Sequence, residues 1–167
     1  MRTQLLLTCT AYLIIIVKMN HSEIARKLFN EGYSCSQAVA GAFAEKCQMS
    51  LKSMLKISIA FGGGFLHSRD LCGALSGAGI VLGILFGDTD PDGKIKFRNR
   101  FEGIVKAFSQ LNGSTNCRVL LDSLQANISK ISTTCDLTEN EREKRPCLKY
   151  VLDCVTLIEE FQKCKCE

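Results

Sequence analysis

Four cysteines stand where the sequence predicts the start of a helix: Cys35, Cys72, Cys117 and Cys147. The first-turn N–H groups of a helix have no backbone partner and carry the positive end of the helix dipole. A thiol beside them is biased towards the thiolate, which attacks disulfides and binds soft metals. Arg69 and Lys149 add positive charge close in sequence to two of the four cysteines.

Cys72 is the candidate for the central thiol of a site. It follows the glycine run 62–64 and precedes Gly73, so other segments can approach its backbone closely. We therefore predict that the four helix starts converge in the fold. The chemistry expected of such a cluster is reversible dithiol–disulfide exchange, in which a thiolate attacks and a neighbouring thiol resolves the mixed disulfide.

Other functions fit the same four residues. Four thiolates also suit an iron–sulfur cluster or zinc, and the sequence does not separate these from exchange. A third class is a helical accessory protein for a partner or transporter, with the cysteines as packing residues. The four cysteines form no Cys-x-x-Cys pair and no c-type haem signature, and the glycine run lacks the Gly-Lys-Ser/Thr ending of a nucleotide-binding loop.

The remaining candidate residues carry less weight. His67 is close enough to Cys72 in sequence to act as a base or ligand, but a solvated loop histidine is the simpler interpretation. Residues 88–93 resemble the opening of a calcium loop, yet Asn99 stands where a bidentate glutamate is needed. The tail holds Cys164 and Cys166, which we treat as accessory. The other cysteines are expected to be packing or incidental thiols: Cys9, Cys47, Cys135 and Cys154.

Composition predicts one folded domain in a reducing compartment. The 167 residues are 46% hydrophobic and 23% charged, which is enough apolar material for a core without disulfide staples, although there are 10 cysteines. The net charge of +4 is modest and scattered, so nucleic acid is not an expected partner. We expect a redox partner protein or a small thiol or disulfide instead. The sequence does not indicate an oligomeric state.

Residues 1–18 form an apolar leader separate from the domain. Leu5 to Val17 is almost wholly apolar behind Arg2, so it resembles a signal-peptide core but is too short for a confident membrane span. Met19 opens a polar sequence typical of a helix start, and translation from Met19 is the main alternative. We predict a single helical domain over 19–163, a Cys-x-Cys tail over 164–167, and a cytoplasmic location, with export or membrane anchoring through the leader as the alternative.

Apolar spacing of three and four residues predicts an all-α fold. The expected helices run from Ser22 to about 30, from Ser34 to about 47 and from Ser50 to before 62, followed by an uncharged helix from about 71 to 86. We expect that uncharged helix to be the buried centre of a compact bundle. A turn over 88–93 precedes a helix that ends at Asn112-Gly113. A short helix near Cys117, a polar loop to 145 and a last helix opened by Pro146 complete the chain.

Five segments carry a resemblance to a known family: 32–39 with Cys35, 61–64, 72–78 beginning Cys72-Gly73-Ala74, 116–118 and 147–151. Together they resemble the redox-active protein family C-GCAxxG-C-C, over about residues 22–161. The resemblance implies a small helical bacterial or archaeal protein with a thiol or metal redox role. Its characteristic cysteines match Cys35, Cys72, Cys117 and Cys147. The chain departs from the family in its leader, its six additional cysteines and residues 65–68, where members more often have glycine and arginine.

Overall fold

The protein is described by a computed structural model, which defines residues 19–122 and 145–163. All regular elements in these two segments are helical, apart from one isolated bridge between Leu71 and Asn116. The helices are α2 (His21–Asn30), α3 (Cys35–Ala42), α4 (Leu51–Ser58), α5 (Gly73–Phe86), α6 (Pro91–Asn112), α7 (Cys117–Asp122) and α9 (Cys147–Lys163), with a 3₁₀ turn, η1 (Ile59–Phe61). The predicted all-α fold is therefore confirmed. The leader and the Cys-x-Cys tail lie outside the described residues.

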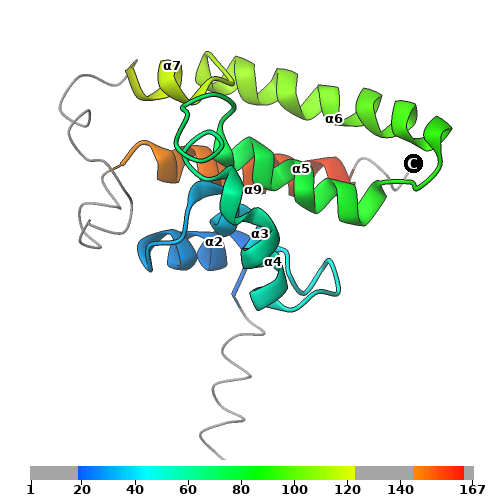
Figure 1. Cartoon of the computed structure of the whole chain (residues 1–167), viewed down its shortest axis with the longest axis horizontal. Coiled ribbons are helices and arrows are strands. Elements are labelled where there is room, and N and C mark those ends of the chain that lie inside the picture. The colour runs from blue at the N-terminus through cyan, green and yellow to red at the C-terminus, as the bar shows by residue number, and fades with distance from the viewer. Residues whose placement is uncertain (1–18, 123–144, 164–167) are drawn as a thin grey trace, which may run out of the picture.

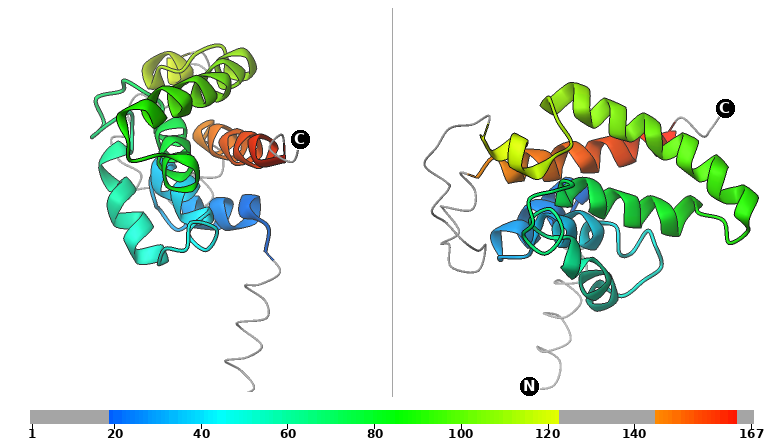
Figure 2. Two further views of the ribbon diagram at one scale, coloured as in Figure 1. Left: turned by 90° about the vertical axis from the view of Figure 1, so that its right-hand side faces the viewer. Right: turned by 45° about the horizontal axis from the view of Figure 1, so that its top comes forward.

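The helices pack around a layer made of α5 and α9. Helix α6 covers one side of this layer, and α2, α3 and α4 lie on the other (Figures 1 and 2). The core consists of apolar side chains contributed by each layer, among them Phe29, Phe43, Leu75, Phe108 and Ile158, all at most 1% exposed. Such burial is the main free-energy term that holds the helices together. The described residues contain no helix with the length and apolar content needed to cross a bilayer.

Burial in α5 is incomplete. The face made by Ala74, Leu75, Ala78, Val81 and Leu82 is buried, but Ile84 in the same helix is 40% exposed. Helix α3 is buried more completely, because every residue from 36 to 42 is in the interior. We expected this uncharged helix to be the buried centre of the bundle. Instead it is buried on one face, because α6 covers only part of its outer face.

Side-chain caps set most helix boundaries. Ser34 and Ser50 accept hydrogen bonds from the third backbone N–H of α3 and α4, as predicted, and Gly113 ends α6 with φ of 81°. Three boundaries differ from prediction. Asn20 rather than Ser22 caps α2, because it forms a reciprocal capping box with Glu23.

Two further boundaries also moved. Helix α3 stops at Ala42, and residues 43–48 continue as turns in place of the predicted helix to about 47. Helix α6 begins at Pro91, inside the predicted turn, because Asp90 accepts a hydrogen bond from the Gly93 N–H and proline suits the first helical position. These changes leave the predicted order of helices intact.

Candidate functional site

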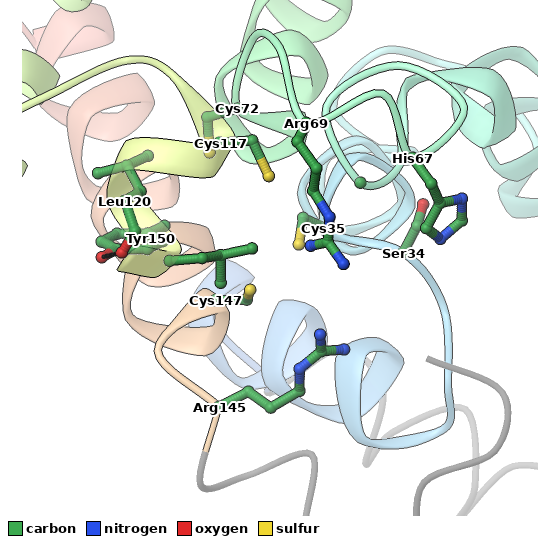
Figure 3. Close-up of a pocket in the computed structure, with 13 residues that line it drawn as sticks. Ser34, Cys35, His67, Arg69, Cys72, Cys117, Leu120, Arg145, Cys147 and Tyr150 are labelled. Atoms are coloured by element: carbon green, nitrogen blue, oxygen red, sulfur yellow. Dashed lines mark hydrogen bonds between the residues drawn. The ribbon is translucent and has the colours of Figure 1, made fainter. Parts of the chain in front are cut away.

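One pocket at an end of the bundle brings the four predicted cysteines together (Figure 3). Cys35, Cys117 and Cys147 are the first residues of α3, α7 and α9, and Cys72 is the N-cap of α5. The predicted convergence of four helix starts is therefore confirmed. None of the six cysteines in the described residues, which also include Cys47 and Cys154, is disulfide-bonded.

Short backbone pairing places Cys72 beside Cys117. The Cys72 N–H donates to the Thr115 carbonyl at 2.8 Å, and the Cys117 N–H donates to the Asp70 carbonyl at 2.6 Å. Asn116 then caps α7, because its side-chain oxygen accepts hydrogen bonds from the N–H groups of residues 118 and 119 at 3.0 and 3.2 Å. The segment before α5 and the segment before α7 thus run antiparallel across the pocket, and each ends in a cysteine.

The glycine run forms an unusual loop above these two cysteines. Residues 63–67 all have positive φ, and so does Arg69 at 66°; the non-glycine residues in this loop with positive φ are Phe65, Leu66, His67 and Arg69. Left-handed backbone costs a non-glycine residue roughly 1–2 kcal/mol. Gly64 is required for a second reason, since a Cβ there would lie 2.9 Å from the Cys117 Cβ. The loop is therefore held against its local preference, and it presents Arg69 to the pocket.

Cys35 and Cys147 are the two pocket thiols that influence each other's ionisation most strongly. A capping box between Ser34 and Gln37 fixes the start of α3, and Pro146 precedes the start of α9. Across the interface of these two helices, the ionisation of the two thiols is linked, because the Cys35 thiol favours the Cys147 thiolate by hydrogen bonding to it. The Cys147 side chain is 8% exposed, whereas Cys35 is only partly buried. A protonated thiol can stabilise a neighbouring thiolate in this way, because a hydrogen bond to the charged form favours that form.

Cys147 is the thiol most prone to ionise. The hydrogen bond from Cys35 and the positive charges of Arg145 and Arg69 outweigh burial and lower the pKa of Cys147 to about 7. The same hydrogen bond, together with burial, raises the pKa of Cys35 well above its ordinary value. At neutral pH about half of Cys147 is therefore thiolate, whereas Cys35 stays protonated.

Cys72 lines the pocket as expected of a central thiol, but its burial opposes the predicted bias of a helix-start thiol towards the thiolate. Burial raises the pKa of Cys72 to about 12, although backbone N–H groups of Leu75 and Ala74 at the start of α5 act in the opposite direction. Burial also raises the pKa of Cys117, against the lowering effect of Arg69. The helix start favours the thiolate as argued from the sequence, but the loss of water around Cys72 has the larger effect.

Sequence reasoning missed Arg145 and Tyr150, which both line the pocket. Arg145 was assigned to a polar loop, and only its position two residues before Cys147 could have indicated a role. Tyr150 lies one helical turn after Cys147, and its hydroxyl donates a hydrogen bond to the Leu120 carbonyl at 3.0 Å, so it ties α9 to α7. Lys149 is outside the pocket lining and is engaged instead by Asp153 at 2.6 Å.

The other candidates take peripheral places. His67 is exposed at the pocket edge beside Ser34 (Figure 3). Cys47 and Cys154 are buried, and burial raises the pKa of each. Cys9, Cys135, Cys164 and Cys166 lie outside the described residues. Within 19–122 and 145–163, no three histidine, cysteine, aspartate or glutamate side chains are grouped closely enough to hold a metal ion.

Comparison with known proteins identifies the family. A family model described as "Putative redox-active protein (C_GCAxxG_C_C)" matches residues 33–161, which include all four pocket cysteines. A protein of Archaeoglobus fulgidus described only as uncharacterized is 29% identical over 148 residues, which cover 80% of this chain and 89% of that protein. No solved structure matches the chain. The family match spans most of the chain and the whole pocket, so the chain belongs to the C_GCAxxG_C_C family of redox-active proteins.

Proposed function

We propose that the protein carries out thiol–disulfide exchange, as an oxidoreductase or electron carrier, with Cys147 as the attacking thiolate and Cys35 as the resolving thiol. The observation that carries the proposal is the Cys35–Cys147 pair in one pocket, in which the pKa of Cys35 is raised and only Cys147 has a pKa lowered, to about 7. A thiol whose pKa is near the ambient pH combines a useful thiolate fraction with good nucleophilicity.

The reaction balances without another reagent. The Cys147 thiolate attacks one sulfur of a substrate disulfide, forms a mixed disulfide and releases the first substrate thiolate, which takes up a proton. Cys35 then loses its proton and attacks the Cys147 sulfur, releasing the second substrate thiol and forming the Cys35–Cys147 disulfide. Two electrons pass from the protein dithiol to the substrate. The reverse sequence, with a dithiol partner protein or small thiols, returns the pair to the reduced state.

Cys72 and Cys117 have a supporting role in this proposal. Both are protonated at neutral pH because burial raises the pKa of each. They line the same pocket and can accept the disulfide from the first pair by further exchange. We also propose the cytoplasm as the location, since reducing conditions there keep such thiols available for reaction.

Site-resolved disulfide mapping tests the proposal. The reduced full chain is treated with hydroxyethyl disulfide at neutral pH, and its peptides are analysed by mass spectrometry without reduction. We expect a Cys35–Cys147 disulfide. In Cys35→Ser the mixed disulfide should accumulate on Cys147, whereas in Cys147→Ser residue 35 should remain unmodified. Cys47→Ser is the matched control, because Cys47 is buried and outside the pocket lining.

Two results would contradict the proposal. One is a first disulfide that forms elsewhere and leaves Cys35 and Cys147 as thiols. The other is an iron–sulfur cluster or zinc ion held by the pocket cysteines, measured by visible absorption and metal analysis of an anaerobic preparation. The second result would favour the metal-binding alternative, for which the four thiols around one pocket supply the ligand type.

A further inference from the structure

Two arginines reach into the pocket, and none of the described residues that line it is acidic. Arg69 comes from the glycine loop and Arg145 from the turn before α9, and their side chains extend towards Cys35 and Cys147 from opposite sides (Figure 3). The lining residues otherwise comprise the four cysteines and neutral or histidine side chains. The pocket therefore carries excess positive charge beside the reacting sulfurs.

Arg145 has an unusual environment for a charged side chain. It is only 7% exposed, and its Nε is buried without a hydrogen-bond partner. The ion pairs formed between described residues all lie elsewhere, at His21, Lys27, Lys106 and Lys149. A buried guanidinium is costly unless charged or polar groups compensate it. The unused donor at the pocket therefore points to an acceptor that enters from outside.

Arg69 is held in place at a local energetic cost. Its own φ is 66°, and the backbone N–H groups of the left-handed residues 65–67 are bonded to η1 or to Gly62. Its guanidinium extends into the pocket towards Cys35, and its charge opposes the effect of burial, which raises the pKa of the Cys117 thiol. Strained backbone that persists in a fold is concentrated at functional positions, because the surrounding contacts must hold it there. The structure thus maintains Arg69 at the pocket and not in the surrounding solvent.

The adjacent helices add to the positive electrostatic potential in the pocket. Helices α3 and α9 begin at Cys35 and Cys147, so the positive ends of both dipoles meet at the thiol pair. Space is limited, because the cavity has a volume of about 30 Å³. Such a volume holds about two water molecules. Only a small group can enter beside the sulfurs.

We infer that the pocket selects disulfides that carry a small anionic group, such as a carboxylate or sulfonate, and that Arg145 and Arg69 bind this group while Cys147 attacks the neighbouring sulfur. This inference rests on the proposed exchange reaction. It adds a substrate class to that reaction. The protein should react faster with anionic disulfides than with neutral or cationic ones. Arg145 is the main specificity residue, since its buried Nε donor has no partner within the described residues.

Alkylation of Cys147 tests the anion site without any redox chemistry. Iodoacetate and iodoacetamide attack the same thiolate with the same leaving group, but only iodoacetate is an anion. The rate with iodoacetate divided by the rate with iodoacetamide is measured at Cys147 by mass spectrometry and compared with the same ratio for free cysteine. Because both reagents need the same thiolate, a change in the thiol pKa cancels in this ratio. We expect the ratio at Cys147 to exceed that of free cysteine by about tenfold, as for one charge-assisted hydrogen bond.

Variants assign the effect to a residue. Arg145→Gln should bring the ratio down towards that of free cysteine, and Arg69→Gln should lower it as well. Arg100→Gln is the matched control, because Arg100 is exposed on α6, lies outside the pocket lining and carries the same charge. It should leave the ratio unchanged. The wild-type ratio needs no variant, so the inference is testable even if a substitution prevents folding.

A second measurement distinguishes a substrate group from a free anion. The rate of oxidation by dithiodipropionate, which is anionic, is compared with the rates for hydroxyethyl disulfide, which is neutral, and cystamine, which is cationic. We expect the anionic reagent to be fastest. A ratio at Cys147 equal to that of free cysteine, or equal rates for the three disulfides, would overturn the inference. Neither result would affect the Cys35–Cys147 disulfide predicted for the exchange reaction.

Discussion

Among individual residues, the contrast between Cys147 and Cys72 decides the chemistry. Both cysteines begin helices, and the dipole contributes at most roughly 2 kcal/mol at each. Complete burial of an ionisable group can shift its pKa by several units, which is a larger effect. Cys72 is 4% exposed and its pKa rises to about 12, whereas the Cys35 thiol and two arginines compensate the burial of Cys147. The neighbours of a thiol matter more here than its place in a helix.

The hydrogen bond from Cys35 makes a testable contribution to the reactivity of Cys147. The thiolate forms as the pH rises through the pKa, so alkylation of Cys147 by iodoacetamide should reach half of its maximum rate near pH 7. In Cys35→Ala the hydrogen bond is lost, and this midpoint should rise by about one pH unit. Cys35→Ser keeps a hydroxyl donor and should stay closer to the wild type. Equal midpoints in all three proteins would show that the Cys35 thiol does not stabilise the thiolate.

Among the helices, the packing of α5 on α3 positions the pocket. Gly77 of α5 faces the backbone of α3, and a Cβ at this position would lie 2.7 Å from the Ser36 carbonyl oxygen and 3.0 Å from the Val39 Cβ. Cys35 and Cys72 lie at the starts of these two helices. The close approach at Gly77 therefore sets how near the two cysteine-bearing helix starts come.

Gly77→Ala should separate the two helices. Overpacking against a rigid backbone typically costs about 1–3 kcal/mol of unfolding free energy, measured here by urea denaturation. Gly79→Ala in the same helix is the control, because a Cβ there would meet only the Phe101 ring, at 3.4 Å. Alanine is the better helix former, so this change should be neutral or stabilising by up to about 1 kcal/mol. The opposite order of stabilities would contradict the proposed contact.

For the whole molecule, the burial of thiols links stability to alkaline pH. The pKa values of Cys35, Cys47, Cys72, Cys117 and Cys154 are all raised in the folded state, mainly by burial except at Cys35, where the hydrogen bond to Cys147 comes first. The unfolded chain loses these protons at a lower pH than the folded chain. Their contribution to stability is therefore complete below the ordinary thiol pKa and is lost as the pH rises through the folded-state values.

Cys72 allows this linkage to be measured. Its pKa rises from 9.0 to about 12, so between about pH 8 and pH 10.5 the wild type should lose about 2 kcal/mol through this residue alone. Cys72→Ala removes the titration, and its unfolding free energy should fall by about that much less over the same interval. Ser76→Ala, a small non-titrating change in α5, is the control and should follow the wild type. Parallel losses in all three proteins would contradict a buried, protonated Cys72.

Local signals in the sequence were sufficient for the helices and their order. Ser34, Ser50, Asn116 and Gly113 act on backbone groups within one turn, so their effects are present in the sequence without a fold. The starts of α2 and α6, which differ from prediction, are also set by local caps, at Asn20 and Asp90. The family resemblance, based on the cysteine segments, was also available from the sequence and is confirmed by the family match.

The sequence by itself determined that four cysteines begin four helices, because capping and dipole effects depend on residues only a few positions apart. Only the tertiary structure decided which thiol ionises, because desolvation, the Cys35–Cys147 hydrogen bond and the charges of Arg69 and Arg145 arise between segments distant in the chain. The burial of Arg145 and the left-handed loop that carries Arg69 were likewise decided by the tertiary structure. Both depend on surrounding contacts that exist only once the helices have packed.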